Sequence, residues 1–172
     1  MKHMMLDIET SGNLPGCKIL SIGAVLFDKK GFYEEFYMRA SYDSQLHLVD
    51  HQSTMDWWNT QDEEVFKEAF GGTDDLKDVL NKLIEFITRH NPSTIWCKGA
   101  AFDFAILNVA LNSLGLKELP FKKLRCMRGL NDLLDIPEIW LKGNKHNALD
   151  DAKNQAINVG RCISKIDGWE RI

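Results

Sequence analysis

The chain has 172 residues, of which 44% are hydrophobic and 27% charged, a balance typical of one globular domain with a buried core. Its 21 basic and 25 acidic residues give a formal net charge of −4, which argues against broad binding to duplex nucleic acid through a basic face. Four scattered cysteines without a Cys-x-x-Cys pair point to neither a zinc knuckle nor a disulfide framework, and no apolar run is long enough to cross a membrane. Because the sequence enters a strand pattern at once, without a secretory signal, we expect a single cytoplasmic domain over residues 1–172.

Three strand-like runs open the chain and predict an antiparallel meander. They extend over His3 to Ile8, Ile19 to Phe27 and Phe32 to Arg39. The connection Asp28-Lys29-Lys30-Gly31 has the composition of a hairpin turn between the second and third runs.

After Tyr42 the pattern becomes helical and then alternates between helices and short strands. Ser53 and Asp56 have the spacing of a capping box in front of Trp57-Trp58. The later predicted elements are a helix from Leu76 to His90, a strand at Thr94 to Cys97, a helix from Asp103 to Leu114, a strand around Leu124 to Met127 and a helix from Ala148 to about Ile163. Together with the opening meander, this order predicts an α/β domain with a mixed sheet covered by helices.

Asp7 and Glu9 directly follow the apolar run Met4-Met5-Leu6 and are separated by one residue. On a β-strand both side chains project from the same face, about 6.5–7 Å apart along the backbone. Two buried carboxylates without a counter-charge repel each other and lose solvation, and a pair of divalent cations such as Mg²⁺ would remove that cost. The alternative is structural: an acid at the end of a strand often belongs to the turn that follows, here Thr10 to Gly16. Further carboxylates elsewhere in the chain decide between the two.

A third acid, Asp103, comes after the predicted strand Thr94 to Cys97 and the small residues Gly99 to Ala101. In an open α/β sheet this region beyond the carboxyl end of a strand is where ligands commonly bind. The structural alternative is a favourable interaction of this acid with the dipole of the following helix. Phe102 is a candidate for stacking on a base, although a core aromatic is the commoner role.

The last group of candidate residues is His146-Asn147-Ala148-Leu149-Asp150-Asp151. In one continuous helix His146 and Asp151 would lie about 140° apart and would not share a face, so we place His146 in the preceding loop. Asn147 is then the N-cap, and Asp150 completes a capping-box-like pair with it. Asp151 is left without a local structural role, and His146 in the loop can reach the same pocket.

Metal-assisted hydrolysis of a phosphodiester bond is the chemistry that needs such a set of acids together with a histidine. One divalent ion lowers the pKa of a bound water, and a second ion stabilises the leaving 3′-oxygen and the charge that develops on the phosphate. A histidine side chain has an unperturbed pKa of about 6.5 and is suited to accept the proton of the water at neutral pH.

In their order along the chain, these segments resemble the signature of the DnaQ-like DEDDh 3′→5′ exonucleases of the ribonuclease H-like superfamily. The matching segments are Asp7-Ile8-Glu9-Thr10, Phe102-Asp103 and His146 through Asp151. The block from Ser53 to Trp58 and the extension of the last motif to Ala152 are closest to the phage-type, exodeoxyribonuclease VIII-like branch. The resemblance covers nearly the whole chain. It implies a five-stranded mixed sheet, three antiparallel strands and then parallel ones, and removal of single nucleotides from a 3′ end as 5′-monophosphates.

The resemblance also implies roles for individual residues. By motif position, two Mg²⁺ or Mn²⁺ ions would be bound by Asp7, Glu9, Asp103 and Asp151. His146 would be the general base. Thr10 would contact the terminal nucleotide through its backbone, with Phe102 stacking nearby.

Basic residues that we expect near the mouth of the site are Lys98, Lys142 and Lys145. A second basic group could track a nucleic-acid backbone, although a solvated face is its more ordinary explanation; it consists of Lys122, Lys123, Arg125 and Arg128. Family members act on DNA or on RNA. The sequence contains no residue whose role would have to be recognition of the 2′-hydroxyl group that distinguishes RNA from DNA. We expect a single-stranded 3′ end as substrate, with DNA slightly favoured over RNA.

Other interpretations stay open at this point. The protein could be an exoribonuclease of the same family, an endonuclease of the same broad fold, or a binding module that has lost catalysis; the last should lack a metal ligand, and none is missing here. Trp57 and Trp58 could belong to the core, to a base-stacking surface or to a homodimer contact. Because neighbouring helix residues point in different directions, we expect at least one of them in the core.

Overall fold

The computed structural model describes residues 1–141 and 143–167. Its strands are β1 (His3–Thr10), β2 (Ile19–Asp28), β3 (Gly31–Arg39), β4 (Thr94–Cys97) and β5 (Leu124–Cys126). They form one five-stranded sheet in the order β3-β2-β1-β4-β5. β2 pairs antiparallel with β1 and β3, whereas β4 pairs parallel with β1 and β5. The predicted meander followed by parallel strands is confirmed.

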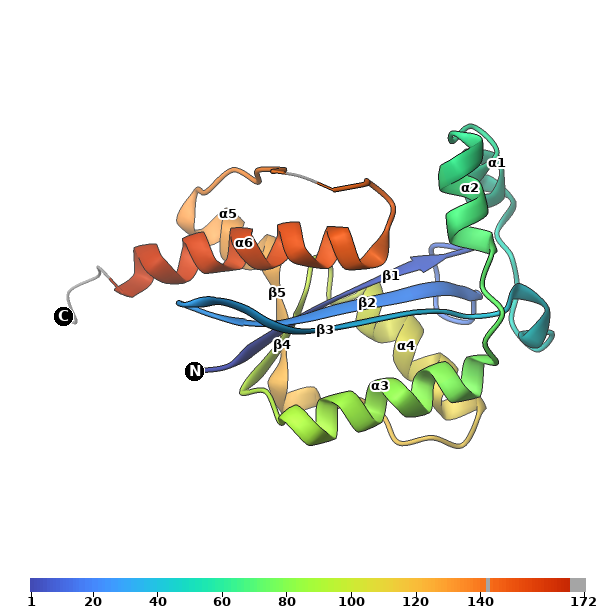
Figure 1. The fold of residues 1–172 in the computed structure, drawn as a ribbon, viewed down its shortest axis with the longest axis horizontal. Coiled ribbons are helices and arrows are strands. Elements are labelled where there is room, and N and C mark those ends of the chain that lie inside the picture. The colour runs from blue at the N-terminus through green and yellow to red at the C-terminus, as the bar shows by residue number, and fades with distance from the viewer. Residues whose placement is uncertain (142, 168–172) are drawn as a thin grey trace.

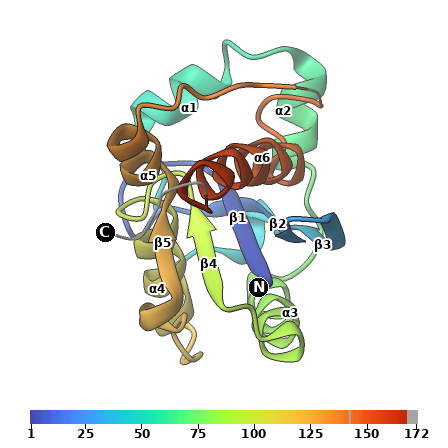
Figure 2. The same ribbon diagram turned by 90° about the vertical axis from the view of Figure 1, so that its left-hand side faces the viewer.

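Helices cover both faces of this sheet (Figure 1). They are α1 (Gln52–Trp58), α2 (Glu63–Phe70), α3 (Leu76–His90), α4 (Asp103–Ser113), α5 (Met127–Leu134) and α6 (Ala148–Asp167), with 3₁₀ turns at Tyr42–Ser44 and Phe121–Lys123. α3 and α4 lie on one face, α5 and α6 lie on the other, and α1 and α2 stand at one end of the sheet. Figure 2 shows the same layers with α6 seen almost along its axis. In the described part of the chain, no helix combines the length and the apolar character needed to cross a membrane.

The side chains of β1 alternate between two hydrophobic clusters. Met4 and Leu6 are buried between the sheet and the helices α3 and α4. Met5 is buried on the opposite face, against α6. Asp7 and Glu9 continue the row of Met5, because alternate residues of a strand share a face. Both acids therefore face α6, as the sequence predicted, at the end of the strand where that helix begins.

A glycine in β2 allows α6 to begin close against the sheet. Gly23 pairs with Asp7 across the ladder of β1 and β2. A Cβ atom placed on Gly23 would lie 2.2 Å from the carbonyl carbon of Ala148, the first residue of α6. A glycine in a strand often marks such a close approach of another backbone. The contact fixes the height of the first turn of α6 above the sheet, and this turn carries Asp151.

The predicted capping box at the start of α1 is wrong. The N-cap is His51, and Ser53 lies inside the helix. The helix begins earlier because the backbone N–H of His51 donates to the carbonyl of Ser11 at 3.0 Å, which fixes the chain before the predicted cap. Asp56 instead accepts a hydrogen bond of 2.7 Å from the side chain of Gln52, one turn back.

Trp58 belongs to a small third cluster, together with Leu20 of β2 and Ala69 of α2. Its side chain is buried, and its indole N–H donates to the carbonyl of Thr10 at 2.9 Å. Trp57 is 40% exposed. The expectation that at least one of the two tryptophans lies in the core is confirmed, and Trp58 joins α1 to the end of β1.

Candidate active site

The predicted acids and the histidine come together at one end of the sheet, on the side of α6. Asp7 and Glu9 lie in β1, Asp103 opens α4, Asp151 lies in the first turn of α6, and His146 lies in the loop before it. The negative charges of the other acids act on Asp7 and on Glu9. Segments that are far apart in the sequence therefore contribute to one acidic cluster.

Burial raises the pKa values of these carboxyl groups, and the charges of the other acids add to this effect at Asp7 and Glu9. Burial raises the pKa of Asp7 well above its ordinary value, and the charges of its acidic neighbours raise it further. Burial, followed by the charges of Asp151 and Asp103, raises the pKa of Glu9 to about 8. Burial also raises the pKa of Asp103 to about 6 and that of Asp151 above its usual range. The cluster therefore retains protons near neutral pH unless cations offset its charge.

His146 is held beside the acids although it lies outside the helix. The ligand atoms of Glu9, His146 and Asp151 all lie within 4.8 Å of one another. The backbone of His146 has a φ of 64°, in the left-handed region, and its N–H donates to Asp151 Oδ2 at 3.0 Å. Its ring lies edge-on against Trp57, with 4.8 Å between the ring centres. Non-glycine residues in this region occur where surrounding contacts determine the backbone, often at functional sites.

The cap of α6 is confirmed at Asn147 and differs at Asp150. Asn147 Oδ1 accepts hydrogen bonds from the backbone N–H groups of Leu149 and Asp150, at 3.1 and 3.2 Å. The carboxylate of Asp150 does not reach back to the N-cap; its Oδ2 accepts from the backbone N–H of Asn144 at 2.9 Å. Asp150 thus has the structural role expected of it, with a different partner: it ties down the loop that carries His146.

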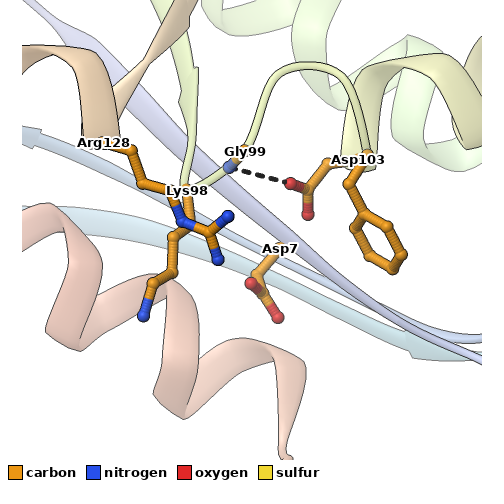
Figure 3. Close-up of a pocket in the computed structure, with 6 residues that line it drawn as sticks. Asp7, Lys98, Gly99, Asp103 and Arg128 are labelled. Carbon is orange, nitrogen blue, oxygen red and sulfur yellow. Dashed lines mark hydrogen bonds between the residues drawn. The ribbon is translucent and has the colours of Figure 1, made fainter. Parts of the chain in front are cut away.

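A cavity of about 300 Å³ lies beside the acids (Figure 3). Its lining residues are Asp7, Lys98, Gly99, Phe102, Asp103 and Arg128. The backbone N–H of Gly99 donates to Asp103 Oδ2 at 3.4 Å, and the ammonium group of Lys98 is paired with Glu138 at 2.6 Å. Phe102 is half-buried and packs against the hydrophobic core cluster that α3 and α4 cover.

The other predicted substrate contacts lie outside this set of lining residues. Thr10 is buried, and its hydroxyl donates to the carbonyl of Gly12 at 2.6 Å. Lys145 is exposed in the loop before His146. Lys142 lies outside the described residues. The substrate contacts of Thr10, Lys98, Phe102 and Lys145 stay predictions.

Gln155 is a site residue that the sequence did not single out. Its Nε2 donates to Asp7 Oδ1 at 2.7 Å, and both side chains are buried. Gln155 follows Asp151 by four residues, so the two side chains lie on the same face of α6. That spacing is the signal that could have revealed it.

The side chain of Arg128 lies apart from those of Lys123 and Arg125, two members of the basic group that the sequence predicts. Lys123 reaches the side chain of Asn91 at 2.6 Å, beyond the end of α3. The guanidinium of Arg125 donates to the backbone carbonyls of Lys122 and Leu124. Arg128 lines the cavity beside Asp7.

The donor set fits hard divalent cations. Mg²⁺ and Mn²⁺ prefer oxygen ligands, and carboxylates supply them. The charges that act most strongly on Asp7 and Glu9 are those of other acids, which is the condition that a bound cation relieves. Asp7, Glu9, Asp103 and Asp151 could hold such ions, with His146 next to them.

Comparisons with known proteins place this chain in a family. Residues 2–163 match the family described as the 3′-5′ exoribonuclease Rv2179c-like domain. An exodeoxyribonuclease of Enterobacteria phage T4 is 26% identical to the chain over 123 residues. This match covers 62% of the chain and 54% of the phage protein, so the chain spans about half the length of that relative.

Solved structures share the fold. The nuclease domain of 3′hExo, described as a DEDDh family member bound to rAMP, has a TM-score of 0.69 at 16% identity, covering 99% of this chain and 97% of that one. Exonuclease X in complex with 5′ overhanging duplex DNA has a TM-score of 0.63 at 17% identity, covering 98% of this chain and 94% of that one. The likenesses establish a ribonuclease H-like fold. The match over residues 2–163 shows that the chain belongs to the family described as the 3′-5′ exoribonuclease Rv2179c-like domain.

Proposed function

We propose that this protein is a two-metal-dependent 3′→5′ exonuclease that hydrolyses the terminal phosphodiester bond of single-stranded nucleic acid and releases nucleoside 5′-monophosphates. The observation that carries the proposal is the convergence of four carboxylates from β1, α4 and α6, with His146 beside Glu9 and Asp151. Membership of a 3′-5′ exonuclease family supports the direction of digestion.

Two Mg²⁺ or Mn²⁺ ions would be held by Asp7, Glu9, Asp103 and Asp151. Bound there, the ions would activate a water molecule and stabilise the charge that develops on the phosphate and the leaving oxygen. Gln155 orients Asp7 through its hydrogen bond, and the Gly99 N–H orients Asp103. Near neutral pH, bound cations would favour the ionised form of carboxyl groups that otherwise retain protons.

His146 is the proposed general base. Its backbone bond to Asp151 and its ring contact with Trp57 keep the imidazole beside Glu9 and Asp151, where the attacking water would be placed. A neutral ring nitrogen accepts the proton of that water as the new P–O bond forms. Trp57 restricts the ring to one side of the site, so the base is in position before substrate arrives.

DNA is the slightly favoured substrate by sequence, and the phage T4 relative is named an exodeoxyribonuclease. RNA is the second candidate, because the family description names exoribonucleases. In either case the terminal nucleotide would enter the cavity beside Asp7 and Asp103, whose lining also includes Phe102 and Lys98. Thr10 and Lys145 would add contacts from the end of β1 and from the loop before α6.

Digestion of matched DNA and RNA oligonucleotides, each labelled at the 5′ end, tests this proposal. With Mg²⁺ we expect a ladder that shortens from the 3′ end and a 5′-mononucleotide product, whereas circular single-stranded DNA should stay intact. Asp7→Ala and Asp151→Ala should each lower the rate by about a thousandfold or more, which corresponds to several kcal/mol of lost transition-state stabilisation.

Asp150→Asn is the matched control for the acid substitutions. It removes a carboxylate next to Asp151 and keeps an oxygen that can accept the hydrogen bond from Asn144. We expect this variant to digest at a rate close to that of wild type. An active Asp7→Ala protein, or cleavage of circular DNA, would contradict the proposed function.

A further inference from the structure

Arg128 lies in the first turn of α5, and its side chain enters the acidic site from the β5 side of the sheet. Its backbone N–H donates to the carbonyl of Lys98 at 3.3 Å, and the preceding residue, Met127, is fully buried against α6. Its guanidinium passes the small residue Gly99 and extends toward the carboxylates of Asp7 and Asp103 (Figure 3). The backbone is therefore fixed, and the charged end reaches the cavity.

The guanidinium of Arg128 has no hydrogen-bond or ion-pair partner among the residues that the structure describes. Every other arginine in that part of the chain has one: Arg39 binds Glu68, Arg89 donates to His90, and Arg125 and Arg161 donate to backbone carbonyls. Lys98, the other cation of the cavity, is already paired with Glu138. An exposed guanidinium with five unused donors is suited to bind a phosphate with two parallel hydrogen bonds.

Neutralising the acids is a poor explanation for Arg128, because its guanidinium donates no hydrogen bond to them in the described structure. Two divalent ions would also balance the four negative charges of the carboxylates, and the guanidinium would then face a site without excess negative charge. The anion that the reaction itself brings to this place is a phosphate of the substrate strand. We propose that Arg128 is a substrate-binding residue that holds a phosphate next to the metal-binding carboxylates, an inference that rests on the proposed function.

The chain offers a matched control for this proposal. Arg125 is also exposed, stands only three residues earlier, and directs its guanidinium to backbone carbonyls at 2.8 and 2.9 Å, outside the cavity. Arg128→Ala and Arg125→Ala remove the same charge from neighbouring positions. We would measure KM and kcat of both variants and of Arg128→Lys on a single-stranded oligonucleotide with Mg²⁺, and the melting midpoint of each protein.

For Arg128→Ala we expect KM to rise by about 10- to 100-fold, the range that corresponds to losing a hydrogen-bonded contact between charged groups. Arg125→Ala should change KM less than about threefold, and Arg128→Lys should recover part of the loss as a point charge. The melting midpoints should stay close to that of wild type, because the guanidinium of Arg128 has no hydrogen-bond or ion-pair partner among the residues that the structure describes.

Oligonucleotides in which one phosphate at a time is replaced by an uncharged methylphosphonate identify the phosphate. If Arg128 binds a given phosphate, the methylphosphonate at that linkage should penalise wild type and have little further effect on Arg128→Ala. Equal KM values for Arg128→Ala and Arg125→Ala would overturn the inference while leaving the proposed exonuclease activity intact. The same conclusion would follow if, at every linkage, the methylphosphonate penalised Arg128→Ala as much as it penalised wild type. A wild-type protein that digests neither the DNA nor the RNA oligonucleotide would instead overturn the proposed function.

Discussion

The side-chain amide of Gln155 holds the carboxylate of Asp7 in place. The hydrogen bond of 2.7 Å between them favours the ionised carboxylate and opposes burial, which raises the pKa of Asp7. Gln155→Met removes the donor and nearly preserves the volume. We expect the affinity for Mg²⁺ to fall by about 10- to 100-fold, the usual cost of losing a group that orients a metal ligand. Titration calorimetry and the Mg²⁺ dependence of the rate measure this loss.

The stability of the metal-free variant separates this effect from misfolding. Gln155 Oε1 is buried without a hydrogen-bond partner in the described structure, so the substitution also removes an unsatisfied polar atom. The melting midpoint of Gln155→Met in EDTA should therefore lie within a few degrees of that of wild type. An intact midpoint together with an unchanged Mg²⁺ affinity would show that Gln155 does not orient Asp7.

The sequence identified the residues of the candidate site better than it identified their partners. Spacing and order indicated the acids and His146, because the chemistry requires these residue types at the ends of regular elements. The predicted partner of Asp150 was wrong because helix-cap statistics describe bonds within the first turn, whereas the carboxylate of Asp150 binds the backbone of Asn144, six residues earlier in the preceding loop. The spacing from Asp151 points to Gln155, but Asn154 and Asn158 have similar helical spacing, and the position of β1 is what selects Gln155 among the three.

The start of α6 depends on its close contact with β2 at Gly23. An added methyl group would lie 2.2–2.3 Å from backbone atoms of Ala148 and Leu149, so α6 would have to move away from the sheet. We expect Gly23→Ala to lower the free energy of unfolding by about 1–3 kcal/mol or more, and to lower activity because Asp151 moves with the first turn. Urea unfolding and the digestion assay measure the two effects.

Gly160, farther along α6, is the matched control for Gly23. A Cβ atom placed there meets no heavy atom within 4 Å. Gly160→Ala should raise the free energy of unfolding by up to about 1 kcal/mol, because alanine loses less backbone freedom in a helix. If both substitutions changed the free energy of unfolding in the same direction, the close approach at Gly23 would not be what limits the position of α6.

The elements that the sequence predicted most accurately have a strong internal pattern. The bounds of α3 and β4 were predicted to the residue, since one has a clear amphipathic period and the other is a short apolar run between turns. α2 and α5 were missed because each has only eight residues, too few for a period to stand out. Packing explains them: Ala69 of α2 lies against Trp58, and Met127 of α5 lies in the cluster beneath α6.

The whole protein carries a formal net charge of −4, and four of its acids are gathered at one end of the sheet. Two divalent ions bound there would offset as many charges as the protein carries in excess. Metal binding would thus remove the repulsion between the net negative charge of the protein and a nucleic-acid strand. It would also relieve the repulsion among the carboxylates of the acidic cluster. Stability, metal content and pH should accordingly be linked.

In the metal-free protein, stability should fall as the pH rises from about 5 to 8. The folded protein holds Glu9 with a pKa of about 8 and Asp7 with a raised pKa, whereas in the unfolded chain both titrate near pH 4. Between these values the folded state binds more protons, so the free energy of unfolding decreases with rising pH. For Glu9 this penalty is absent below about pH 4 and nearly complete above about pH 8, and the raised pKa of Asp7 adds to it in the same direction. Glu9→Gln, which cannot ionise, should lose less stability over this range in EDTA.

Mg²⁺ should oppose this loss because it binds the ionised carboxylates. At about 100 times its dissociation constant, a ligand stabilises the folded state by about 2.7 kcal/mol, which is about 5–10 °C in the melting midpoint of a chain of this length. Bound protons compete with the ion, so the increase caused by Mg²⁺ should be larger at pH 8 than at pH 5.5. Asp7→Asn should reduce the increase at both pH values. If Mg²⁺ raised the melting midpoint equally at both pH values, and Asp7→Asn did not change this increase, the ion would bind elsewhere on the protein.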